Sequence, residues 1–175
     1  MPKPRKTLGD WKEPYLQSLM RLIETQSKAT IVSWCLACAE ARFLPIYQKS
    51  FPDDARPMAA LNAAREWMDG KIKLPEARKR ILDAHAAARE AEDIPAAQAA
   101  ARAIGQAAST IHAPAHSLGI AFYGAAAAAY DRVGINEKPE VYERIAAGEC
   151  AKLEEALRAV AVENEPNPAK IGWRC

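Results

Sequence analysis

Few cysteines, few glycines and little imbalance of charge limit what this 175-residue chain can be. Four cysteines are too few for a disulfide scaffold, and a cytosolic chain would keep them reduced. The chain has 24 basic and 22 acidic residues, and the basic excess is concentrated in the opening MPKPRK. The sequence shows no basic stripe of the kind that forms a nucleic-acid-binding surface, so nucleic acid is not an expected partner. Glycine occurs 8 times and alanine 38 times, which favours an all-helical protein.

The sequence also lacks the apolar core of a signal peptide near its start. Its most apolar stretch, Ile31 to Tyr47, is interrupted by Glu40, Arg42 and Pro45 and reads as too short to span a bilayer. We therefore expect a soluble, cytoplasmic protein that does not contact a membrane. A chain of this length can bury about 70% of its unfolded surface, which one domain with one core accounts for.

Catalytic motifs are missing as well. The chain has no H-E-x-x-H, no glycine-rich phosphate loop, no G-x-S-x-G and no run of acidic residues at the spacing of a di-iron bundle. A chain without a reactive constellation is more often a binding module than an enzyme. The sequence therefore predicts a protein that has no catalytic activity and needs no cofactor.

What the sequence does contain is a succession of helical segments separated by prolines and capping residues. The first helix is predicted from about Pro14 to Glu24. The second starts after Ser27 as its cap and extends to about Leu44, where Pro45 should kink or end it. The third is capped by Asp53 or Asp54, has Pro57 in its first turn and stops at Gly70. Pro75 opens the fourth helix and Pro95 opens the fifth. Pro114 either opens the sixth helix or kinks a longer one, and Pro139 leads into the seventh, which ends near Val162.

These segments predict a single-domain, all-α bundle of about seven helices over residues 1–175. The segment of about 28–44 is apolar nearly all round, so we expect it to be a mostly buried central helix, with Leu36, Cys38, Ala39 and Phe43 inaccessible to solvent. The fifth and sixth helices contain long runs of small residues and should pack closely together. Residues 1–12 and 163–175 lack periodicity and are expected to be loosely held ends.

Two pairs of residues invite a metal or redox interpretation. Cys35 and Cys38 lie in WCLAC, but a redox cysteine pair needs a helix N-terminus, and these two fall inside a helix. Together with His112 and His116, four residues apart in TIHAPAHSLG, they supply the ligand set of a Cys2His2 zinc site, which stays an alternative. Pro114 lies between the histidines and can rotate one away from the other.

A polar core is the simpler interpretation of the histidines. We expect His85 and His116 to pack between helices as neutral rings with hydrogen-bond partners, and His112 to do the same. Glu40 lies within the most apolar helix and should pair with an arginine or a histidine, because an unpaired buried carboxylate is costly.

Four stretches in chain order resemble a known family: WCLACAEARFLPIY, FPDDARPMAALNAAREWMDG, ARKRILDAHAAARE and ARAIGQAASTIHAPAHSLGIAFYG. They are similar to a group of helical immunity proteins associated with bacterial polymorphic toxin systems, and they cover about Ile31 to Tyr130. The resemblance implies a small cytoplasmic protein that binds and neutralises a cognate toxin without catalysis. A net charge of +2 argues against a nuclease target, whose inhibitors often present an acidic face.

The loop at Asp53, Asp54 and Arg56 is our expected part of a partner-binding surface, because it joins two helices and carries charges of both signs. Asp54 also has a local role as a helix cap. Arg56 is therefore the more informative position, and we expect Arg56→Ala to weaken partner binding while leaving the melting temperature nearly unaltered.

Overall fold

Prolines stand in the first turn of most helices, because a residue there needs no backbone N–H donor. The computed structural model describes residues 4–173, and all regular structure in that range is helical. In chain order the elements are α1 (Pro14–Glu24), α2 (Lys28–Cys38), a π-helical turn (Ala39–Phe43), α3 (Leu44–Gln48), α4 (Arg56–Met68), α5 (Leu74–Glu90), α6 (Pro95–Ser109), a 3-10 turn (Pro114–His116), α7 (Ser117–Val133) and α8 (Pro139–Val160).

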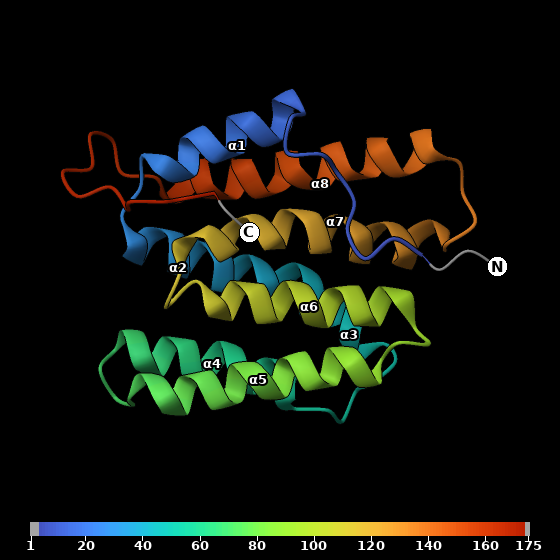
Figure 1. The fold of residues 1–175 in the computed structure, drawn as a ribbon, viewed down its shortest axis with the longest axis horizontal. Coiled ribbons are helices and arrows are strands. Elements are labelled where there is room, and N and C mark those ends of the chain that lie inside the picture. The colour runs from blue at the N-terminus through green and yellow to red at the C-terminus, as the bar shows by residue number, and fades with distance from the viewer. Residues whose placement is uncertain (1–3, 174–175) are drawn as a thin grey trace.

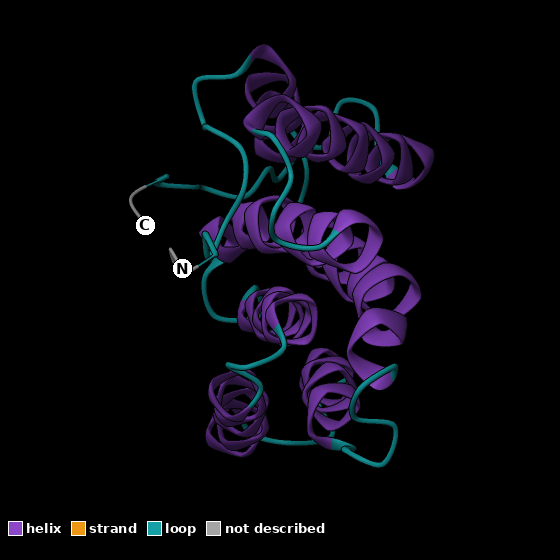
Figure 2. Cartoon of the chain, turned by 90° about the vertical axis from the view of Figure 1, so that its right-hand side faces the viewer, coloured by secondary structure: helices purple, strands orange, loops and turns teal. Residues whose placement is uncertain are grey.

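The helices stack in layers (Figure 1). α1 and α8 form one outer layer, α4 and α5 form the other, and α2, α6 and α7 lie between them. The view at a right angle shows the helices packed along the whole height of the described chain, joined by short loops (Figure 2). The predicted all-α bundle is therefore confirmed.

The predicted core helix is confirmed in its buried residues: Leu36, Cys38, Ala39 and Phe43 are at most 5% exposed. One face of this helix is nevertheless open to solvent, and it carries small residues. α6 is the more completely enclosed element, because it packs on α4, α5 and α7 and on the segment that ends at Gln48.

Pro45 does not end the helix, which was one of the two outcomes expected from sequence. The backbone N–H of Leu44 bonds to the carbonyl of Ala39, five residues back, so the chain makes one wide turn just before the proline. Pro45 then lies in the first turn of α3, where its missing N–H is not needed. The helix continues to Gln48.

The continuous helix Lys28–Gln48 is therefore longer than the sequence suggested. At 21 residues it is long and apolar enough to cross a membrane, so the argument that the stretch is too short was wrong. Half of its most apolar window is buried inside the bundle, and the core helix of a bundle meets the same criteria of length and composition.

The close packing of α6 and α7 predicted from their small residues is also confirmed, since these two form the most extensive helix pair. Glycines allow neighbouring side chains to reach this pair. A Cβ at Gly124 of α7 would clash with the ring of Phe43, and one at Gly105 of α6 would lie 2.6 Å from the ring of His85. Both rings thus pack directly on helix backbone.

Both described ends make defined contacts, unlike the loosely held ends expected from sequence. The Leu8 N–H donates to the Phe122 carbonyl (3.2 Å), so residues 4–13 run across α7 (Figure 1). At the other end the Ala169 N–H donates to the Gln26 carbonyl (2.8 Å). The parts of the expected loose ends at residues 1–3 and 174–175 lie outside the described residues.

Candidate functional site

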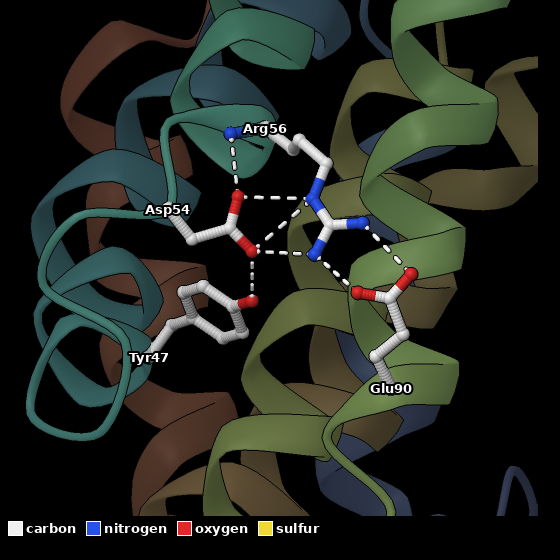
Figure 3. Close-up of polar contacts among 4 residues, drawn as sticks. All are labelled: Tyr47, Asp54, Arg56 and Glu90. Carbon is white, nitrogen blue, oxygen red and sulfur yellow. Dashed lines mark hydrogen bonds and ion pairs between the residues drawn. The ribbon is translucent and has the colours of Figure 1, made fainter.

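The loop predicted to bind a partner is joined to three helices (Figure 3). Asp54 accepts hydrogen bonds from the hydroxyl of Tyr47 (2.6 Å) and from the backbone N–H and guanidinium of Arg56 (3.0 and 2.8 Å). The same guanidinium donates to Glu90, at the end of α5, through Nη1 at 3.0 Å and Nη2 at 2.6 Å. Arg56 therefore links α3, α4 and α5.

The charges in this cluster stabilise one another. Hydrogen bonds from Arg56 hold the pKa of Asp54 at about 2, although partial burial works in the opposite direction. Burial and the bond to Asp54 raise the pKa of Tyr47, so its hydroxyl stays protonated and donating. Asp54 holds the first N–H of α4, although Ala55 occupies the cap position itself.

This geometry bears on the expected role of Arg56. An arginine that bridges two carboxylates contributes to stability, so the expectation that Arg56→Ala leaves the melting temperature unaltered does not fit the structure. Asp53 lies exposed beside the cluster. A partner-binding role for Asp53, Asp54 and Arg56 stays a prediction.

The buried carboxylate of the fold is Glu149 rather than Glu40. Glu40 pairs with an arginine, as expected, but its side chain is 41% exposed and its partner Arg65 is 37% exposed. Glu149, in α8, is 1% exposed and was missed. The sequence held a signal for it, because Glu149 lies on one helix face with Ala146 and Leu153, both of which are buried.

Three cations surround Glu149. It accepts hydrogen bonds from Arg42 of the π-helical turn, from Arg132 of α7 at 2.5 Å and from Lys152 at 3.2 Å. Burial alone would raise the pKa of this carboxyl, but the bonds and charge of Arg42, aided by Arg132 and Lys152, outweigh it and lower the pKa. Glu149 thus stays ionised and fixes Arg42 and Lys152 in place.

Arg42 and Lys152 border an open groove of about 740 Å³ between α2 and α8. Trp34 lines it and donates a hydrogen bond from its indole N–H to the Leu153 carbonyl (3.0 Å), which joins the two helices below the groove. Val160 of α8 is 53% exposed and also lines the groove. The other residues that line the groove are Ala29, Thr30, Ser33, Ala37, Cys38, Ala41 and Ala156.

The three histidines form a separate group near the junction of α5, α6 and α7. The rings of His112 and His116 meet edge to face, with centroids 5.2 Å apart, and Nδ1 of His116 lies 2.8 Å from Oε1 of Gln106. Burial is the main cause that lowers the pKa of all three histidines. Nδ1 of His112 is buried without a hydrogen-bond partner, unlike the expectation for that residue.

Pro114 opens a 3-10 turn that leads directly into α7, so His112 lies in the preceding loop and His116 in that turn. Within residues 4–173 no group of three or more histidine, cysteine or acidic side chains could hold a metal ion, so the alternative Cys2His2 site is not assembled. Burial raises the pKa of Cys38 to about 11 and also raises the pKa of Cys35, which opposes the thiolate form that zinc and redox chemistry need.

Comparison with known proteins gives one family. A family model with the description "Imm-5 like putative immunity protein" matches residues 21–156. No curated protein and no solved structure matches the chain. The matched range contains the Asp54–Arg56 loop, the histidine group, Glu149 and most of the residues that line the groove.

Proposed function

This chain belongs to the family described as "Imm-5 like putative immunity protein", and from that premise we propose that it binds and neutralises a cognate bacterial toxin. The family match over residues 21–156 is the observation that supports this proposal. The binding takes place in the cytoplasm, and the toxin is a protein encoded beside this one.

Neutralisation occurs by occupation of the toxin and not by catalysis. The described cysteines of the chain are buried with raised pKa values, and its buried carboxylate is neutralised by three cations, so these groups are suited to structure rather than to chemistry on a substrate. A binding protein of this kind needs surface complementarity to its partner, and hot-spot residues in a pocket supply most of the affinity.

Protection of growing cells tests the proposal. The toxin encoded next to this gene is expressed from an inducible promoter, with this protein or with an unrelated helical protein of similar size. We expect growth only with this protein, and a complex of the two purified proteins on size-exclusion chromatography. Failure to bind or to protect against any neighbouring toxin would overturn the immunity function.

The stoichiometry of protection separates binding from catalysis. A binding inhibitor silences the toxin only when it reaches an equimolar amount, whereas an enzyme that modifies the toxin would act at a small fraction of that amount. Titration of the purified toxin should therefore end at one equivalent. We propose that no cofactor takes part, and stoichiometric zinc in protein purified without added metal would contradict this.

A further inference from the structure

The groove between α2 and α8 has the dimensions of a helix-binding site. Along the open face of the helix Lys28–Gln48, the small residues Ala29, Ser33, Ala37 and Ala41 follow one another at intervals of four and all are exposed. At a rise of about 1.5 Å per residue this row is roughly 18 Å long, which is the length of about three helical turns. Small side chains let a second backbone approach closely.

The charge of the groove is one-sided. Its lining contains Arg42 and Lys152 and no acidic residue. Just below them, Glu149 pairs with Arg42, Arg132 and Lys152, so among the ion pairs of the described residues three positive charges share one carboxylate. Nε of Arg42 is buried and has no hydrogen-bond partner within the described chain.

The two ends of the groove differ. Ala29 and the exposed Val160 lie at one end, and Arg42 and Lys152 lie at the other, because α2 and α8 cross the groove in opposite directions. An occupant that matches it has apolar side chains along about three turns and a carboxylate at one end. An amphipathic helix has this pattern, and helix-in-groove binding is a common mode of recognition.

We propose that this groove binds an amphipathic helix of the toxin, with its apolar face on α2 and its acidic side chains paired with Lys152 and Arg42. The inference rests on the proposed function, since it names the part of the toxin that is recognised. Two cations already oriented by a buried carboxylate bind an acidic partner without the cost of ordering their own side chains.

Substitutions in the groove test this proposal with the purified toxin encoded beside the gene. Ala37→Glu adds bulk and a negative charge to the exposed floor, Ala37→Lys adds similar bulk with a positive charge, and Lys152→Glu reverses the charge at the end. Ala151→Glu is the matched control, because Ala151 is exposed on α8 and does not line the groove. Melting curves verify that each variant is folded.

We expect Ala37→Glu and Lys152→Glu to weaken toxin binding by about tenfold or more, and the Ala151→Glu control to stay within about twofold of the unmodified protein. Ala37→Lys should bind more tightly than Ala37→Glu. Raising the salt concentration should weaken the unmodified complex more than the Lys152→Glu complex.

Four results would overturn the proposal. If all groove variants bind as well as the control, the toxin is bound elsewhere and only the immunity function stands. If Ala37→Lys binds less well than Ala37→Glu, the occupant is basic. If the protein alone is a dimer that Ala37→Glu dissociates, the occupant is a second copy of this chain. A toxin that does not bind the unmodified protein removes both the function and this inference.

Discussion

Two helix surfaces rich in small residues differ in this fold, because one is covered by other helices and the other is exposed to solvent. α6 and α7 pack on each other through their small residues, and the rings of His85 and Phe43 from other elements pack on Gly105 of α6 and Gly124 of α7. On α2 an equally regular row from Ala29 to Ala41 faces solvent and lines the groove beside α8.

The comparison shows that small residues allow another element to pack closely on a helix but do not determine which element packs there. On α6 and α7 the rings of His85 and Phe43 from neighbouring elements fill the space left by glycines, so these surfaces are covered within one chain. In the groove the lining residues are small on α2 and widely spaced on α8, so they leave the space open. The cations at the end of the groove are oriented by their hydrogen bonds to Glu149.

The closed interface should give the largest loss of stability when it is emptied. Phe43→Ala removes a fully buried ring that packs on Gly124, and we expect it to cost about 3 to 5 kcal/mol of unfolding free energy. Urea unfolding monitored by circular dichroism measures this. A loss below about 1 kcal/mol would mean that the interface is no better packed than the groove.

Glu149→Gln tests the ionic link beneath the open groove. The amide keeps the shape of the side chain but lacks the charge that holds Arg42, Arg132 and Lys152, so we expect a loss of about 1 to 3 kcal/mol. The partly exposed cations can turn to water, which keeps this below the cost of Phe43→Ala. Glu40→Gln is the control, because that carboxylate is 41% exposed, and it should change stability much less.

Arg56→Ala, in the predicted partner-binding loop, should have an intermediate effect. Its guanidinium bridges Asp54 and Glu90, and the loss of this bridge should lower the melting temperature by about 2 to 4 °C. Differential scanning calorimetry measures the change. If the temperature is unaltered and toxin binding falls, Arg56 belongs to a recognition surface instead.

The pH dependence of stability should separate the two regions. The pKa values of His85 and His116 are lowered in the fold by burial, so their contribution is complete above about pH 6.5 and is lost as pH falls through the lowered values. The pKa of Glu149 is also lowered, so its contribution is lost only below about pH 4.5. Urea unfolding at a series of pH values should show that the free energy of unfolding falls in two pH ranges, one below about pH 6.5 and one below about pH 4.5. His85→Gln should reduce only the loss of stability in the upper range.

The smallest effect should come from the open row itself. Ala37→Gln places a longer side chain where the structure has only solvent, so we expect a change within about 0.5 kcal/mol. Chemical denaturation detects a difference of this size. A loss as large as that of Glu149→Gln would show that the groove closes in solution and that its open face is not free.

Local sequence signals predicted the helices better than the side-chain partners. Prolines and glycines such as Pro57 and Gly70 act within a turn, so they fixed helix starts and stops correctly. The continuation of the helix through Pro45 was not predicted, because it depends on a backbone hydrogen bond from Leu44 to Ala39 that cannot be inferred from residue type.

The candidate site was predicted less well, since it depends on which helix faces meet. Glu40 was singled out because its sequence neighbours are apolar, yet it points to the surface beside Arg65. Glu149 has small, uncharged neighbours in sequence, Gly148 and Cys150, and its burial is compensated because Arg42 and Arg132 reach it from other elements of the fold. A row of four small residues was visible in the sequence, but nothing local distinguishes an open row from a closed one.

The wide turn at Ala39–Phe43 gives the helix Lys28–Gln48 two angular phases. An α-helix advances about 100° per residue, and the wide turn takes in one extra residue, so each residue after it lies on the face that an uninterrupted α-helix would give to the residue before it. Trp34 is set by the first phase, and Tyr47 with its bond to Asp54 is set by the second. Deleting a single residue within this turn would convert it into an ordinary α-helical turn and keep the two halves in their present relative orientation, whereas a deletion elsewhere in the helix would rotate one half by about 100° relative to the other. In an alignment of related chains, a one-residue gap at this turn would therefore indicate an uninterrupted α-helix with the same packing, whereas a gap elsewhere in the helix would change which side chains face the core.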